Sequence, residues 1–169
     1  MSKNVIYASF SYKHHTKIAE YLFDKHQWKP VYWIGFKDFE KEVKASFPDT
    51  IFHASQEVRR GRLVDCICDK DLVPIDRKII HSLSKYESIS LGMMQRRDTT
   101  GWNFSFNERI QFYYKMLNYW NTVIHHLKLE VFVSWVIPHS AEEYILYQLC
   151  KYYKIPTLMV EAARCIEKY

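Results

Sequence analysis

The residue best placed for chemistry in this chain is His139, which stands between Pro138 and a segment that begins like a helix. Proline fixes the local chain direction, and a helix N-terminus offers exposed N–H groups and a partial positive charge. An imidazole in such a place suits an anion, a phosphate or a developing alkoxide, or it acts as a base toward a hydroxyl group. The alternative is that His139 only packs over a sheet edge or assists the helix cap.

A second group of hydroxyls and imidazoles follows the first apolar run of the chain. This loop contains Ser9, Ser11, His14 and His15. Because it has no glycine, it cannot wrap closely around a pyrophosphate, but it can donate hydrogen bonds to a sugar or to a single phosphate. We therefore take these four residues as candidate substrate contacts.

Three further polar residues are candidate contacts. Ser140 follows the candidate histidine, Glu161 follows the last apolar run, and Arg96 offers a guanidinium fork for phosphate or carboxylate, with C-terminal capping of a helix as its alternative role. By contrast, Glu142 and Glu143 are better explained as acids of a first helical turn, where Glu143 would complete a capping box with Ser140.

Several kinds of site are missing from the sequence. The four glycines are never closer than nine positions, whereas phosphate loops and dinucleotide fingerprints need clustered glycines. Cys66 and Cys68 have no second pair at zinc-site spacing, and no H-E-x-x-H motif or G-x-S-x-G elbow occurs. We expect no metal and no cofactor. The sequence also shows no set of residues arranged for catalysis, so we expect the chain alone to be inactive.

The charge balance is positive, with 24 basic and 19 acidic residues and a net charge of +5. The basic residues are interleaved with acids, and no pattern of a nucleic-acid-binding module occurs, so we expect no nucleic-acid partner. No apolar window approaches the length of a membrane span, and no signal peptide is visible. We expect a cytoplasmic protein, with peripheral association at the inner membrane face as a further option.

Two β-α-β patterns must position these residues. The first runs from residue 5 to 34 through a helix that Thr16 is placed to cap, and the second runs from 131 to 160. Residues 131–137 are apolar at six of seven positions, which is typical of a central parallel strand covered on both faces. The predicted strands are residues 5–8, 31–34, 50–52, 131–136 and 157–160.

The remaining patterns are mostly helical. Residues 63–68 form a short apolar run that fits a strand or a helix, and Ser105 begins a capping box before a long apolar stripe. The stripe consists of Phe106, Ile110, Tyr113, Leu117, Trp120, Ile124 and Leu127. The predicted helices are residues 36–47, 76–96, 106–127 and 140–152, besides the one near Thr16.

These elements predict a Rossmann-like α/β fold with a mainly parallel sheet and helices on both faces. At 169 residues the chain has the length of a single domain. Ligands of such sheets bind beyond the carboxyl ends of the strands. We therefore expect the loops at 9–15, 138–140 and 161–164 to lie at one edge.

Part of the sequence resembles a known family. Residues 135–147 and 153–159, with the Pro138-His139 pair and the Ile155-Pro156 pair, are similar to the amino-terminal half of bacterial capsule and lipopolysaccharide biosynthesis proteins, which are glycosyltransferase-like with two Rossmann-type domains. Residues 93–96 and 106–120 look similar to the same proteins. The resemblance covers about residues 93–160, and residues 4–34 only in general layout.

The resemblance implies transfer of a sugar from a nucleotide-sugar donor to a glycan acceptor, with this chain as the acceptor-side domain. Residues 1–169 would then be the amino-terminal half of a longer protein, and the donor nucleotide would bind mainly to the carboxyl-terminal domain. Two other functions remain open. One is a non-catalytic binding or assembly module, which exposed members of the 13 tyrosines and five tryptophans would suit, and the other is a small α/β enzyme acting on a nucleotide or phosphate ester.

Overall fold

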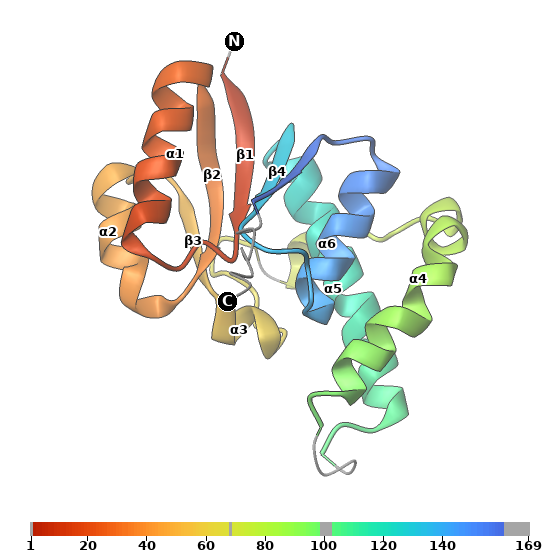
Figure 1. The fold of residues 1–169 in the computed structure, drawn as a ribbon. Coiled ribbons are helices and arrows are strands. Elements are labelled where there is room, and N and C mark those ends of the chain that lie inside the picture. Colours follow the sequence, from red (N-terminus) through yellow and green to blue (C-terminus); the bar gives the residue numbers. More distant parts are fainter. Residues whose placement is uncertain (1, 68, 99–102, 161–169) are drawn as a thin grey trace, which may run out of the picture.

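Five parallel strands form one sheet in the computed structural model, which describes residues 2–67, 69–98 and 103–160 (Figure 1). The strand order is β3-β2-β1-β4-β5, and every pair is parallel. The strands are β1 (Lys3–Ala8), β2 (Trp28–Gly35), β3 (Ile51–Ala54), β4 (Val131–Ser134) and β5 (Thr157–Met159). The predicted Rossmann-like α/β fold is confirmed.

Helices cover both faces of this sheet (Figure 1). On one face α1 and α2 pack against Val5, Tyr7 and Trp33, and on the other α5 and α6 pack against Ile6 and Tyr32. This alternation follows the two-residue period of a strand. Outside that second layer, α4 packs on α5 and α6. The helices are α1 (Lys13–His26), α2 (Glu40–Ser46), α3 (Ser55–Arg59), α4 (Arg77–Gln95), α5 (Phe106–His126) and α6 (Ala141–Tyr152), with short 3₁₀ turns at Lys37–Phe39 and Asp69–Asp71.

The strand order creates a switch point between β1 and β4. The chain leaves β1 through α1 toward β2, and it leaves β4 through α6 toward β5 on the opposite side. Because the two connections diverge, the loops after β1 and β4 flank the place where open parallel sheets bind ligands. The β4 strand lies inside the sheet with all four residues buried, as its apolar run predicts.

Strand β2 begins earlier than predicted. The sequence suggests that Pro30 opens the strand, but β2 starts at Trp28 and includes the proline. A proline lacks the N–H that a ladder needs, so it is tolerated in a strand mainly at an edge or an irregularity. Here the register between β1 and β2 shifts next to the Val5–Pro30 pair, which accommodates the missing donor.

Two further local predictions are wrong. Helix α1 begins at Lys13, so Thr16 is a buried residue of the helix and not its cap. The apolar run at 63–68 is neither strand nor helix where the structure describes it, residues 63–67. Two of its residues, Leu63 and Val64, instead pack against the core cluster that contains α5. A short apolar run shows that a segment is buried but not which backbone conformation buries it.

The caps of the two longest helices explain why their predicted starts agree with the structure. The Asp76 carboxylate accepts a hydrogen bond from the Ile79 N–H at 2.8 Å before α4, and Ser105 and Glu108 form both bonds of a capping box before α5. The stripe of α5 is buried from Tyr113 to Ile124, whereas its first member, Phe106, is exposed. On α4 the apolar residue Ile80 is also exposed.

Candidate functional site

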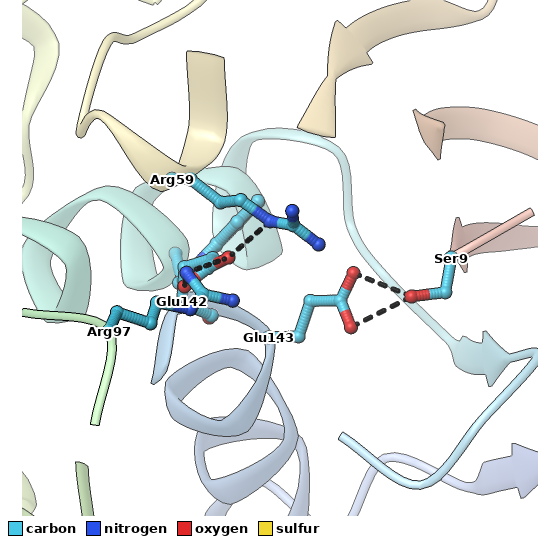
Figure 2. A network of polar contacts seen from close by, with 6 residues as sticks. Ser9, Arg59, Arg97, Glu142 and Glu143 are labelled. Carbon is cyan, nitrogen blue, oxygen red and sulfur yellow. Dashed lines mark hydrogen bonds and ion pairs between the residues drawn. The ribbon is translucent and has the colours of Figure 1, made fainter. Parts of the chain in front are cut away.

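A serine and a glutamate from the two ends of the chain meet at the switch point. The Ser9 Oγ donates to the carboxylate of Glu143, at 2.9 Å from Oε1 and 3.0 Å from Oε2 (Figure 2). Ser9 is the residue directly after β1, and Glu143 lies in the first turn of α6. Ser9 has a φ of 59°, a left-handed conformation that is uncommon for a residue with a side chain. Such strained positions cluster at functional sites.

The Glu143 carboxyl group is buried, with 5% of the residue exposed. Burial disfavours the charged form and is the main cause of the raised pKa of this carboxyl; the neighbouring Glu142 raises it further. The hydrogen bond from Ser9 and the charges of His139 and Arg59 oppose the rise. A buried carboxyl group with a raised pKa, held by a hydrogen bond, is a candidate for exchanging a proton or for stabilising one on a neighbouring group.

The predicted capping box at the start of α6 is wrong. Ser140 is the N-cap residue, but its side chain accepts no hydrogen bond from the helix, and the Glu143 carboxylate faces Ser9 instead. The Ser140 Oγ is buried and meets no hydrogen-bond partner in the part of the chain that the structure describes. The acid that the sequence assigns to local capping therefore makes a contact across 134 residues.

The neighbouring acid, Glu142, points to a different side and is held by two arginines (Figure 2). Its carboxylate lies 3.2 Å from Nη1 of Arg97 and 3.5 Å from Nε of Arg59. The Glu142 side chain is 4% exposed, whereas those of Arg59 and Arg97 are 45% and 40% exposed. Because the backbone oxygen of Glu142 also accepts a 2.9 Å bond from Nε1 of Trp120, the first turn of α6 is fixed to α5.

His139 is exposed in the loop between β4 and α6. Its Nδ1 lies 3.3 Å from the carbonyl oxygen of Ile137, a long contact that leaves the ring accessible. The imidazole is close enough to Glu143 to affect that carboxyl electrostatically. His139 thus lies in the loop that leads into α6, within electrostatic range of the Glu143 carboxyl group.

The loop after β1 is divided between structural and exposed residues. The Ser11 N–H donates to Nδ1 of His15 at 2.9 Å, and the Ser11 Oγ accepts a bond from the Phe36 N–H at 3.2 Å, so both side chains hold the loop together. His15 is fully buried against Trp135, with ring centroids 3.9 Å apart. His14 remains exposed, and its ring lies 5.4 Å from Trp135. The loops after β1 and β4 therefore lie together, as predicted.

The other sequence candidates lie as follows. Arg96 is exposed at the end of α4, where its N–H donates to Gly92, while the adjacent Arg97 reaches Glu142. Glu161 and the loop at 161–164 lie outside the described residues. The sequence does not single out Arg59, Glu142 or Glu143 as site residues, and Arg97 has only the weak signal of standing beside Arg96 at the predicted helix end. First-turn acids and a basic cluster are common on surfaces, and only the fold shows that they meet.

A buried polar network lies on the α5 face of the sheet. The Tyr32 hydroxyl is 2.5 Å from both the Tyr119 hydroxyl and Nδ1 of His53. Burial lowers the pKa of His53 to about 4, and burial together with the charge of His14 lowers that of His15 to about 4. Both histidines are therefore neutral in the folded protein at pH 7.

We expect stability to fall on mild acidification because of these two histidines. Their pKa values are lower in the folded chain, about 4, than in the unfolded chain, about 6.5, so below pH 6.5 the unfolded state binds protons that the folded state does not. The loss should grow as the pH falls from about 6.5 to about 4, with at most about 3 kcal/mol from His53. Urea denaturation across this range measures it, and His53→Gln should flatten the slope. A stability that stays constant between pH 6.5 and 4.5 would contradict the expectation.

Metal-ligand clusters and membrane-spanning helices are both absent from the described residues. Within the described ranges no group of three or more His, Cys, Asp or Glu residues is arranged to hold a metal ion. Of the described cysteines, Cys66 is exposed and Cys150 is buried; Cys68 lies outside the described residues. None of the helices in the described part of the chain combines the length and the apolarity needed to cross a membrane.

The site therefore consists of Ser9, Glu143 and His139, with the arginine pair and Glu142 beside them. All of these residues follow carboxyl ends of strands or lie at the ends of the helices that pack there. Comparison of the chain with protein-family models, with curated proteins and with solved structures finds no match to any of them.

Proposed function

We propose that this chain is the acceptor-side domain of a glycosyltransferase-like protein of bacterial surface-polysaccharide synthesis, which transfers sugar from a nucleotide-sugar donor. The observation that carries the proposal is the pair of Ser9 and the buried Glu143 beside His139 at the switch point of the sheet. The similarity of residues 93–160 to capsule and lipopolysaccharide biosynthesis proteins adds the reaction class.

The reaction needs a base for the acceptor hydroxyl. In the proposed mechanism the exposed imidazole of His139 takes the proton as the hydroxyl oxygen bonds to the anomeric carbon, and the nucleotide leaves with the electron pair of the broken glycosidic bond. The imidazolium that forms is stabilised by the Glu143 carboxylate, which the Ser9 hydroxyl holds in place through one hydrogen bond shared between the two carboxylate oxygens. The charge is stabilised without reorganisation because the carboxylate is already buried and oriented.

The alternative function, a non-catalytic binding or assembly module, depends on exposed aromatic residues. Among the tyrosines and tryptophans that the structure describes, only Tyr12 and Tyr21 are exposed, while large rings such as Trp33 and Trp120 lie in the core. The aromatic content therefore serves packing, which favours the site at the sheet edge as the functional feature. Nucleotide sugars are also better accommodated by two domains than by this glycine-poor chain alone.

The test is turnover by the protein that carries this chain, with a panel of UDP-, GDP- and CMP-activated sugars and surface-glycan acceptors. Glu143→Gln keeps an acceptor for the Ser9 hydroxyl but removes the charge, so transfer should fall about tenfold or more at neutral pH. Glu130→Gln, at the amino end of the sheet beside Asn4, is the matched control and should leave the rate unchanged. Consumption of no sugar in the panel, or an equal rate for Glu143→Gln and the parent, would refute the proposal.

A further inference from the structure

A pocket of about 220 Å³ opens beside Glu142, the residue that precedes Glu143 in α6. Its polar wall contains Arg59, Arg97 and the first turn of α6 at Ala141 and Glu142. Its apolar wall is built from Met94, Phe104 and Phe112. Asp98 also lines it and accepts a bond from the Phe104 N–H at 3.1 Å. The proposed transfer mechanism uses none of these residues.

Glu142 holds the two arginines in place but occupies only part of their hydrogen-bonding capacity. The Nε of Arg59 lies 3.5 Å from Oε1 of Glu142, and Nη1 of Arg97 donates to both oxygens of that carboxylate, whereas each guanidinium has five N–H donors. Within the described part of the chain, Glu142 is the acceptor recorded for Arg59. Glu142 therefore preorganises the two arginine side chains as a pair, and each of them keeps about two fifths of its surface exposed.

Close packing of Gly61 on α5 helps to bring Arg59 to this pocket. Gly61 has a φ of +66°, and a Cβ there would lie 2.9 Å from the ring of Phe112. Only a glycine combines this backbone conformation with such a close approach. The end of α3, which carries Arg59, is thereby held against the helix that supplies the apolar wall.

The surroundings of the pocket contain more arginines than carboxylates. From α3 to the turn after it and at the end of α4 the chain contributes five arginines, and these segments together with the first turn of α6 contribute four carboxylates. The arginines are Arg59, Arg60, Arg62, Arg96 and Arg97, and the acids are Glu57, Asp98, Glu142 and Glu143. The N-terminus of the 12-residue helix α6 adds a partial positive charge. The Ser140 hydroxyl at this helix end is 2% exposed and finds no partner in the described residues.

We propose that Arg59 and Arg97 bind a phosphoryl group, and, resting on the proposed function, that this group belongs to the glycan acceptor whose hydroxyl meets His139. A phosphoryl group presents three oxygens in different directions, so it accepts from two guanidinium groups and from N–H groups of a helix start at once. The arginines converge on the pocket from α3 and from the end of α4, which fits such a group better than a flat carboxylate.

The pocket and the His139 side are close enough to serve one ligand. Arg59 affects the Glu143 carboxyl electrostatically, and Figure 2 shows its guanidinium reaching between Glu142 and Glu143. Glu142 and Glu143, which are adjacent in the first turn of α6, thus face the anionic end and the reacting end of the proposed ligand, respectively. The rings of Phe104 and Phe112 offer apolar surface to the body of the ligand. The substrate class that fits is a phosphorylated sugar.

Calorimetric titration of the protein with inorganic phosphate, glucose 6-phosphate, glucuronate and glucose tests the site. We expect phosphate and glucose 6-phosphate to bind and to compete with each other, glucuronate to bind more weakly, and glucose not to bind. Arg59→Gln and Arg97→Lys should each weaken glucose 6-phosphate binding about 10- to 100-fold, as expected for a lost charge-assisted bond. Arg60→Gln is the control because Arg60 pairs with Glu57 at the surface and does not line the pocket.

The outcomes separate this inference from the proposed transfer reaction. Glu143→Gln should lose transfer but keep phosphate binding. If phosphate binds as expected and no nucleotide sugar is consumed, the phosphoryl site stands and the transfer proposal fails. Absence of phosphate binding at millimolar concentration, tighter binding of glucuronate, or equal weakening by Arg60→Gln and Arg59→Gln would overturn the inference. Arg97→Lys keeps a cation for Glu142, and if that variant still fails to fold, the binding measured for Arg59→Gln decides.

Discussion

His139→Ala is expected to lower the proposed glycan transfer about 100-fold or more while leaving the fold intact, the effect of losing a general base. The ring is exposed and within electrostatic range of the buried Glu143, and its hydrogen bond within the described residues is a long contact of 3.3 Å with the carbonyl oxygen of Ile137. Its removal therefore opens no core cavity. The measurement is the initial rate of transfer with the donor found in the nucleotide-sugar panel.

His126→Ala provides the matched control, because His126 is an exposed histidine at the far end of α5. It should leave both rate and thermal stability unchanged. A normal transfer rate for His139→Ala, with normal thermal stability, would remove this residue from the mechanism and leave the Ser9–Glu143 pair as the site. A rate that falls together with stability would instead assign His139 a packing role.

Trp120→Ala should lower the free energy of unfolding by about 3–5 kcal/mol, the usual cost of removing a large buried ring. Trp120 is fully buried in α5, and its ring lies 5.7 Å from that of Tyr32 in the sheet. Its Nε1 also donates to the backbone oxygen of Glu142, so the substitution removes both packing and the tie that holds the first turn of α6. Urea denaturation of the chain measures the loss.

Trp120→Phe separates the two contributions. It keeps most of the ring but removes the hydrogen bond to Glu142, so we expect a smaller loss of about 1–3 kcal/mol. If the bond positions the pocket, this variant should also weaken phosphate binding although it is well folded. A loss below 1 kcal/mol for Trp120→Ala would contradict the assignment of this residue to the core.

The caps and periodicities of single elements could be predicted from the sequence because they depend on neighbouring residues. Ser105 and Glu108 lie three residues apart, the span of the capping bonds they form, and the stripe from Tyr113 to Ile124 repeats at the helical period. Likewise, two β-α-β patterns are enough to predict parallel strands, because a parallel pair requires a crossover. The fold class follows from such local rules.

Local rules failed where a distant partner offered a better contact. Glu143 has the spacing of a capping residue, yet its carboxylate receives a bond from Ser9, 134 residues away. The same is true of Glu142, whose partners Arg59 and Arg97 come from two other segments. No periodicity encodes these pairs, because sequence spacing says nothing about which loops the strand order brings together.

The sequence by itself therefore determined the Rossmann-like α/β class, the buried central strand β4 and the prediction that the loops after β1 and β4 share an edge. Hydrophobic period and helix caps are local, and they dictate these features. Only the tertiary structure decided that Glu143 pairs with Ser9 beside His139 and that Arg59 and Arg97 flank a pocket. The strand order β3-β2-β1-β4-β5 sets the neighbours of each loop, and burial then selects long-range polar partners over local ones, because a buried charge must be paired.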